Sequence, residues 1–268
     1  SYVTYGLLFL SALYGVRKFE MNRKKGKEEK RILQLENKRK TEELNQARKL
    51  QLSMLPKDIP SLSNLDIAVY MKTATEVGGD YYDFHKSDDN TITAVIGDAT
   101  GHGLNAGMLV SVTKGLFKNL AKQTFVNNIF SQFNESIHSL NIQPMYMSLH
   151  LLQIKGNQMQ VIGAGMPPML YYQSSTGSVV EIESSGPPLG GFRNFKYEKC
   201  DYKLMPGDVL VVMTDGFAER RNNAKEILSG IKHQTSDQII EQFVEANDNW
   251  GEGNPQDDDI TFVVIKVK

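Results

Sequence analysis

Beyond residue 60 the chain alternates between short apolar runs and stretches of helix length. The short runs have the length and the β-branched content of strands, and they lie at 65–71, 91–98, 148–154, 168–173, 208–215 and 260–267. Stretches of helix length lie at 105–121, 126–140 and 236–247. Two of these helices follow one another directly, and the strands cluster in the middle and at the end, so the order is not a regular βαβ alternation. The pattern predicts an α+β domain with largely antiparallel sheets.

The stretch from Glu28 to Leu55 contains no Gly or Pro and consists mostly of good helix formers. It predicts one long helix, which Pro56 and Pro60 end before the domain begins. The apolar positions in this stretch are sparse and only loosely follow a heptad. A homodimer through a coiled coil is therefore an open alternative to a single helix.

Residues 1–16 carry no charge, and Arg17 and Lys18 follow them at once, with more basic residues shortly after. Positive charge behind an apolar run is typical of a membrane exit on the cytoplasmic side, whereas a signal peptide has its basic residues first. The run is shorter than the roughly 20 residues of a spanning helix. The sequence predicts the end of a transmembrane helix at 1–16, a basic linker helix at 17–55 and a domain at 56–268 on the cytoplasmic side of the cell membrane. An interfacial or buried helix at 1–16 is the alternative.

The formal net charge of −1 hides a strong asymmetry. Residues 1–49 hold 13 Lys and Arg against 6 Asp and Glu, and the rest of the chain holds 17 against 25. A basic arm can attract nucleic acid, but such binders interleave aromatic residues with the basic ones and carry a basic domain surface. Neither pattern is evident, so no nucleic acid partner is expected. The single cysteine, Cys200, rules out an intrachain disulfide.

Four acidic residues stand out, because each lies at the end of an apolar run or in a glycine turn, where packing does not call for a carboxylate. They are Asp80, Asp98, Asp215 and Asp258. Carboxylates that converge from strand ends suit hard divalent cations such as Mg²⁺ or Mn²⁺, whereas zinc sites use clustered His or Cys. Each Asp-Gly pair taken alone is ordinary turn chemistry. The set of four in one acidic domain favours a metal site.

Six blocks make the chain similar to a known family. They read QLSMLP at 51–56, EVGGDYYD at 76–83, GDATGHG at 97–103, AGMPPML at 164–170, MPGDVLVVMTDGFAE at 205–219 and DDITFVVIK at 258–266. From about residue 50 onward the sequence resembles the metal-dependent protein phosphatases (the PPM, or type 2C, fold), and specifically their bacterial SpoIIE/RsbU branch. The resemblance implies a β-sandwich of two antiparallel sheets flanked by helices, with a centre of two Mn²⁺ or Mg²⁺ ions at one edge.

The resemblance also implies a role for each of the four carboxylates. Asp98 is expected to bridge both metals, and the backbone carbonyl of Ala99 to complete the coordination of one of them. Asp215 and Asp258 are expected to hold the other metal. Asp80 corresponds to the carboxylate that contacts the centre directly or through water.

The glycine turn after Asp98 is the predicted substrate-binding segment. Gly101 and Gly103 allow the backbone to turn tightly beside the metals and a phosphate, although plain turn chemistry explains them equally well. His102 lies between them, either as a general acid for the departing serine oxygen or as a structural residue at a helix start.

Three positions depart from the patterns of the family. Met166 stands in a block where the branch often shows His, so a polar role of that loop is in doubt. Lys72 is the one basic residue near the first Asp that could replace the phosphate-gripping arginine of eukaryotic relatives. Glu219 stands near the position of their third-metal Asp, which leaves a third metal open.

These features predict a metal-dependent serine/threonine protein phosphatase that is the output domain of a membrane sensor. By resemblance its substrate is a phosphorylated anti-sigma-factor antagonist of the STAS type in a partner-switching pathway. The alternative is a catalytically silent phosphatase-like domain that signals or binds a phosphoprotein. Residues 257–261 also spell the D-x-D-x-T motif of dehalogenase-type phosphotransferases, but that motif should follow a strand near the start of a domain.

Overall fold

The structure is a computed structural model of the chain. It describes residues 2–74, 77–123, 126–142, 144–183, 186–218, 223–250, 256 and 258–268. The chain divides into two compact units, Ser1–Gln46 and Ala47–Lys268, which are described separately.

A single helix, α1 (Tyr2–Met54), accounts for all of the first unit and continues into the second. It includes the helix expected from Glu28 onward and ends two residues before Pro56. In the first unit the side chains whose exposure is described are almost all exposed, including Ile32, Leu33 and Leu35. No helix in the described part of the chain combines the length and the apolar character needed to cross a membrane.

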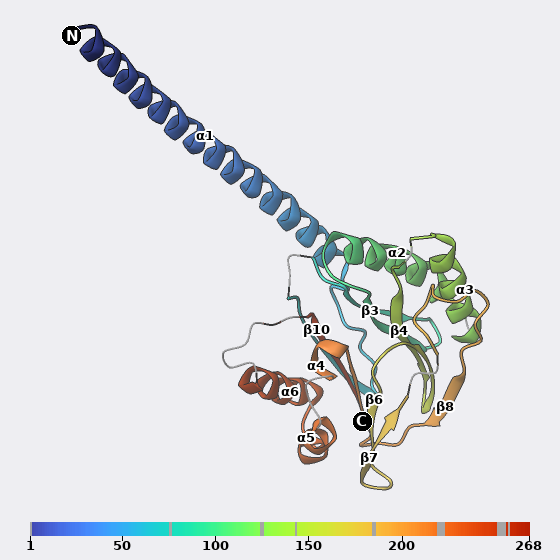
Figure 1. The fold of residues 1–268 in the computed structure, drawn as a ribbon. Coiled ribbons are helices and arrows are strands. Elements are labelled where there is room, and N and C mark those ends of the chain that lie inside the picture. Colours follow the sequence, from blue (N-terminus) through green and yellow to red (C-terminus); the bar gives the residue numbers. More distant parts are fainter. Residues whose placement is uncertain are drawn as a thin grey trace. The chain divides into compact units, whose positions relative to one another are not determined.

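Two five-stranded antiparallel sheets form the second unit (Figure 1). Sheet A has the order β1-β10-β9-β6-β7 and sheet B the order β2-β3-β4-β5-β8. The strands of sheet A are β1 (Leu65–Lys72), β6 (Met169–Gln173), β7 (Ser178–Ile182), β9 (Val209–Met213) and β10 (Ile260–Val267). The strands of sheet B are β2 (Asp80–Lys86), β3 (Ile92–Ala99), β4 (Met147–Lys155), β5 (Gln158–Ala164) and β8 (Lys199–Lys203). This architecture confirms the predicted α+β class and the β-sandwich.

Helices cover the outer faces of both sheets. Helices α2 (Leu104–Leu120) and α3 (Val126–Ser139) pack on sheet B, while α5 (Ala224–Ile231) and α6 (Ser236–Trp250) pack on sheet A (Figure 1). The short helix α4 (Asp215–Ala218) follows β9 and packs on β10. The helices expected at 105–121, 126–140 and 236–247 are therefore confirmed within a few residues.

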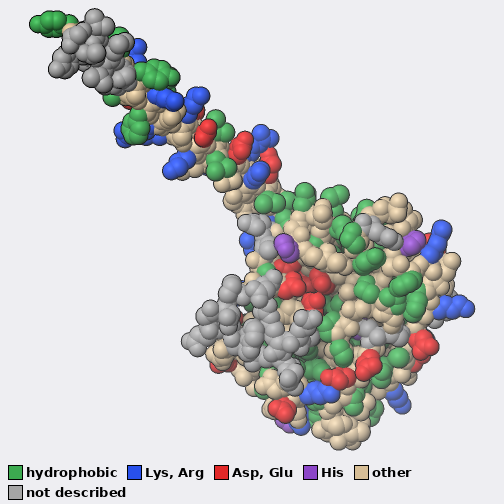
Figure 2. Space-filling view, in the orientation of Figure 1, with side chains coloured by type: hydrophobic (Ala, Val, Ile, Leu, Met, Phe, Trp, Pro, Cys, Tyr) green, Lys and Arg blue, Asp and Glu red, His purple; other side chains and the backbone are tan. Residues whose placement is uncertain are grey.

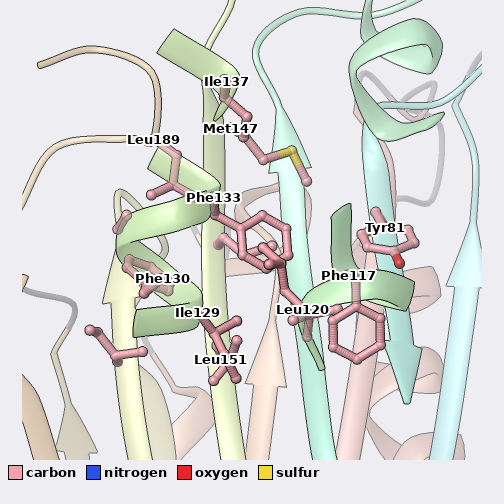
Figure 3. Close-up of a cluster of buried hydrophobic side chains, with 14 of the residues drawn as sticks. Tyr81, Phe117, Leu120, Ile129, Phe130, Phe133, Ile137, Met147, Leu151 and Leu189 are labelled. Atoms are coloured by element: carbon pink, nitrogen blue, oxygen red, sulfur yellow. The ribbon is translucent and has the colours of Figure 1, made fainter. Parts of the chain in front are cut away.

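Three apolar clusters correspond to these layers. One lies between sheet B and its two helices, where Phe117, Phe130 and Phe133 are fully buried (Figure 3). A second lies between the sheets, and a third lies under α5 and α6. In the third cluster the ring of Phe217, just after the predicted ligand Asp215, packs edge-on against Phe262 with centroids 4.8 Å apart. The core thus holds the loop at the end of β9 in place.

Strand β2 was not among the expected strands, because charged residues interrupt its apolar pattern. Asp83 is fully buried within it, and its carboxylate accepts hydrogen bonds from Lys114 Nζ at 2.9 Å and Lys118 Nζ at 2.8 Å. Both lysines come from α2 and neutralise the buried charge. This network fixes α2 on β2, the strand that begins with Asp80.

Candidate active site

The four predicted carboxylates lie at one end of the sandwich. Asp80 and Asp98 are direct cross-strand partners on β2 and β3. Asp215 directly follows Thr214 at the end of β9, and Asp258 precedes the start of β10. Because β9 and β10 are antiparallel neighbours, their two carboxylates emerge at the same end of sheet A. Figure 2 shows acidic side chains gathered on one face of the domain.

Asp80 links the two sheets. Its carboxylate is buried, and Oδ2 accepts hydrogen bonds from Thr214 Oγ1 at 2.9 Å and from Thr261 Oγ1 at 2.6 Å, both on sheet A. Burial raises the pKa of Asp80 well above its ordinary value, and the two hydroxyl donors act in the opposite direction. The hydroxyls therefore fix the carboxylate in one orientation at the start of β2.

Asp98 is the electrostatic centre of the group. Burial raises the pKa of Asp98 to about 9, and the negative charges of neighbouring carboxylates add to this rise. Those carboxylates belong to Asp80, Asp215, Asp258 and Asp259. The predicted ligands are thus close enough to repel one another, which is the expected behaviour of a carboxylate cluster that a cation would stabilise.

The segment before Asp80 packs tightly against Asp98 and Ala99. A Cβ atom on Gly79 would lie 2.7 Å from Asp98 Oδ1 and 2.8 Å from the carbonyl oxygen of Ala99. The amide of Ala99 in turn donates to the carbonyl of Gly79 at 3.0 Å. Only glycine fits at this position. Because Gly79 has no side chain, it can pack against Asp98 Oδ1 and the carbonyl oxygen of Ala99, the two oxygens predicted as metal ligands.

Asp259 holds this same segment from sheet A. It is buried, its Oδ2 accepts from the amide of Gly79 at 2.6 Å, and its Oδ1 accepts from the amide of Ala74 at 2.7 Å. Its neighbour Asp258 is partly exposed. In the acidic run before β10, the carboxylate of Asp259 therefore anchors the loop, while that of Asp258 is partly exposed and accepts a hydrogen bond from the amide of Asp259 at 2.8 Å.

The predicted substrate-binding turn follows Asp98 and opens α2. Gly101 and Gly103 have φ values of +81° and +80°, a left-handed conformation that favours glycine. The amide of Gly103 donates to the carbonyl of Val77, which ties the turn to the segment before Asp80. His102 is exposed between the two glycines. The predicted glycine turn is therefore present, and it leaves the His102 imidazole exposed four residues after Asp98.

The three positions that depart from the family patterns lie in different surroundings. Met166 is buried in the cluster between the sheets, and the carbonyl oxygen of the next residue, Pro167, lies 3.0 Å from His150 Nε2. Lys72 Nζ lies 4.0 Å from Asp248 Oδ1 on α6. Glu219 and Asp257 lie outside the described residues.

The donor set suits a hard divalent cation, because every predicted ligand supplies oxygen. The raised pKa of Asp98 and the clearance at Gly79 support this fit. Within the described ranges, however, no group of three or more His, Cys, Asp or Glu side chains is arranged so that it could hold a metal ion. The assignment of individual ligands accordingly stays a prediction.

Several residues of the site were not predicted from the sequence. Thr214 and Thr261 bind Asp80, Asp259 holds the segment before it, and Gln51 bonds the peptide of Gly78. Only Asp259 had a visible signal, because it belongs to an acidic run. The other three lie within the quoted blocks at 51–56, 205–219 and 258–266, but their partners are far away along the chain, so the sequence does not show what they bind.

Curated relatives include a bacterial phosphatase of the RsbU type. The "Phosphoserine phosphatase RsbU" of Bacillus subtilis is 26% identical over 182 residues, which cover 67% of this chain and 54% of that protein. The chain spans about half the length of the curated relatives that it matches.

Solved structures match the fold. The "SiaA-PP2C domain of Pseudomonas aeruginosa" is 19% identical with a TM-score of 0.76, covering 87% of this chain and 98% of that domain. RsbX in complex with magnesium is 18% identical with a TM-score of 0.64, covering 79% of this chain and 99% of that one. These similarities confirm the PP2C-type fold.

A family model described as "Stage II sporulation protein E (SpoIIE)" matches residues 88–268, which is more than half of the chain and includes Asp98, Asp215 and Asp258. The matched region contains most of both sheets and all the helices that cover them. The chain therefore belongs to the SpoIIE family.

Proposed function

We propose that this chain is a metal-dependent serine/threonine protein phosphatase that hydrolyses a phosphoprotein. The observation that carries the proposal is the convergence of Asp80 and Asp98 from sheet B with Asp215 and Asp258 from sheet A. At this convergence burial raises the pKa of Asp98 to about 9, and the neighbouring carboxylates add to the rise. Similarity to RsbU, a phosphoserine phosphatase by name, supports the same activity.

Two Mn²⁺ or Mg²⁺ ions are the proposed cofactors. Asp98 and the carbonyl of Ala99 would hold one ion, Asp215 and Asp258 the other, with Asp98 shared and Asp80 in contact directly or through water. When bound, such a pair supplies an acidified water as nucleophile and neutralises phosphoryl charge. The similar fold of RsbX, described in complex with magnesium, supports this choice of cation.

The protein side chains then have separate tasks. Thr214 and Thr261 hold Asp80 in one orientation, so that its buried carboxylate does not have to reorganise. The turn at Gly101 and Gly103 leaves backbone room for a phosphate. His102 is exposed at the same turn, where it can donate a proton to the departing serine oxygen.

We extend the proposal to the biological setting. The substrate would be a phosphorylated anti-sigma-factor antagonist of the STAS type, and the chain the cytoplasmic output end of a membrane sensor. The name of RsbU supports a phosphoserine substrate, and the finer substrate class rests on the resemblance of the six blocks to the SpoIIE/RsbU branch. The uncharged run at 1–16 and the basic residues behind it support the membrane setting, and the length of α1 is compatible with a homodimer.

The C-terminal turns of α1 would carry the signal to the site. Gln51 is buried there, and its side-chain amide donates to the carbonyl of Gly78 at 2.6 Å and accepts from the amide of Gly78 at 3.1 Å. Gly78 stands two residues before Asp80. A movement of this end of the helix would therefore shift the segment that packs against Asp98.

Hydrolysis of p-nitrophenyl phosphate and of a phosphoserine peptide tests the proposal. Turnover by the whole chain should require Mn²⁺ or Mg²⁺, stop with EDTA, and be lost in Asp98→Asn and Asp215→Asn. Asp88→Asn, an exposed carboxylate in the turn after β2, is the matched control. Folded protein without turnover under any metal would contradict the proposal and favour a silent phosphoprotein-binding domain.

A further inference from the structure

A loop that follows β7 is joined to sheet B beside the strand that carries Asp98. Leu189 and Met147 exchange two backbone hydrogen bonds, of 3.1 and 2.8 Å. Met147 is in turn the cross-strand partner of Ala99. Because neighbouring strands lie about 4.8 Å apart, the loop runs about 10 Å from Ala99.

The backbone of this loop is held rigidly by α3. Asn134 is buried, its Oδ1 accepts from the amide of Gly190 at 2.9 Å, and its Nδ2 donates to the carbonyl of Phe192 at 3.0 Å. His138 Nδ1 lies 2.9 Å from the carbonyl oxygen of Gly190. The loop is therefore fixed on both sides of Gly191.

In spite of this anchoring, the loop presents a large apolar side chain to solvent. Phe192 is 62% exposed. The ring of the partly exposed Tyr146 lies beside Gly191, the residue before Phe192, since a Cβ on Gly191 would be 3.8 Å from that ring. We call Tyr146, Gly191 and Phe192 the Phe192 platform. A rigid aromatic anchor on a well-ordered loop is typical of protein interfaces.

The platform is continuous with the predicted site. The amide and the hydroxyl of Thr100 both donate to the carbonyl of Tyr146, at 2.9 and 3.1 Å. Thr100 stands between Ala99 and the substrate-binding turn. Figure 2 shows hydrophobic side chains on the same face as the acidic cluster, toward the side where α3 lies in Figure 1. A protein bound over Asp98 would thus extend onto the platform.

We infer that the Phe192 platform is a docking surface for the phosphoprotein substrate, and that it takes an apolar side chain close to the phosphoserine. This inference rests on the proposed function. The acidic site repels an acidic phosphorylated segment until metals bind, so much of the binding energy has to come from contacts outside it. The loop at Leu189 lies about 10 Å from Ala99, which corresponds to about three residues of extended chain. Phe192 is three residues beyond Leu189, which places the apolar residue at least about three positions from the phosphoserine.

Fluorescent peptides that carry a non-hydrolysable phosphonate analogue of phosphoserine test the platform. In the set, a single Phe is moved through successive positions on either side of the analogue in an otherwise polar peptide, and binding to the whole chain is measured by anisotropy in Mn²⁺. One or two positions should raise the affinity about fivefold over the peptide without Phe. Phe192→Ala should abolish this preference. Met205→Ala, an exposed apolar residue in the turn between β8 and β9, should keep it.

Other outcomes overturn the inference. A preference that persists in Phe192→Ala, or no preference at any position, would exclude docking at the platform. Sedimentation that shows a dimer lost in Phe192→Ala, with peptide binding unchanged, would assign the platform to a second copy of the chain. Binding of the phosphonate peptides does not depend on turnover, whereas hydrolysis of p-nitrophenyl phosphate with Mn²⁺ reports on the proposed function separately.

Discussion

The side-chain amide of Gln51 forms two hydrogen bonds with the backbone of Gly78, one to its carbonyl and one from its amide. The two residues come from the last turns of α1 and from the segment that leads into Asp80. Because Gln51 is also buried, water could not easily replace it as the hydrogen-bond partner of the Gly78 backbone. The end of a long helix thus determines the position of a ligand segment.

Gln51→Ala should lower the free energy of unfolding by about 1–3 kcal/mol, because the buried backbone amide and carbonyl of Gly78 both lose their hydrogen-bond partner. Turnover should fall as well, because the segment before Asp80 is released. Gln51→Glu keeps the acceptor but loses the donor and should give an intermediate loss. Urea unfolding and p-nitrophenyl phosphate hydrolysis measure both effects. Asn45→Ala, exposed on the same helix, is the control, and equal behaviour of Asn45→Ala and Gln51→Ala would refute the prediction.

Gly79→Ala should weaken Mn²⁺ binding about tenfold or more. The added methyl group would press on Asp98 Oδ1 and on the backbone oxygen of Ala99, and the backbone oxygen cannot move aside easily. Gly115→Ala is the opposite case, because this exposed glycine in α2 has no atom within 4 Å of a new Cβ. That variant should gain about 0.5–1 kcal/mol of stability with unchanged metal affinity. Calorimetric titration with Mn²⁺ measures the metal affinity of both variants. An unchanged Mn²⁺ affinity in Gly79→Ala would contradict the prediction.

Thr261→Val tests the hydroxyl that orients Asp80. The substitution keeps the shape and removes the 2.6 Å hydrogen bond to Oδ2, so the pKa of Asp80 should rise further and its carboxylate should bind cations less well. We expect Mn²⁺ affinity to fall about tenfold. Thr113→Val, which removes a buried hydroxyl bonded only within α2, should leave the affinity as it was. Equal Mn²⁺ affinity in the two variants would argue against an orienting role for Thr261.

His150 should make the fold sensitive to mild acid. Burial lowers the pKa of His150 from 6.5 to about 4. Unfolding therefore takes up a proton between these two values, so stability is retained above pH 6.5 and is lost as the pH falls toward 4, by up to about 3 kcal/mol. In urea unfolding across this range, His150→Gln should show a smaller loss than the parent. The exposed His233 supplies the control substitution His233→Gln, which should follow the parent, and a parent-like slope in His150→Gln would contradict the prediction.

The strands with continuous apolar runs were predictable from the sequence, and so was the set of carboxylates at their ends. Strand β10 reads as eight residues with one charge and is buried on both faces. Strand β2 was missed because a charged residue such as Asp83 is expected at the surface. Only the fold shows that Lys114 and Lys118 of α2 neutralise this carboxylate and allow it to be buried. Strand β8 was missed for another reason: it is a polar edge strand, with four of its five residues charged or cysteine.

Within the site, the sequence indicated the predicted metal ligands but not the residues that hold them in position by hydrogen bonds. Asp80 and Asp98 are marked by the glycines beside them. Thr214 and Thr261 stand 134 and 181 residues from Asp80, so only the closing of the two sheets brings them together. Gln51 looks like any other polar residue of a charged helix, and only the fold distinguishes it.

The pairing of β1 with β10 has a consequence for synthesis of the protein. These strands are direct neighbours in sheet A although nearly the whole domain separates them along the chain. Strand β10 leaves the ribosome after every other strand of both sheets, together with Asp258 and Asp259. Pairing over such a distance forms slowly, and a nascent chain that lacks it also lacks two carboxylates of the site. A nascent chain without β10 would therefore lack the proposed activity.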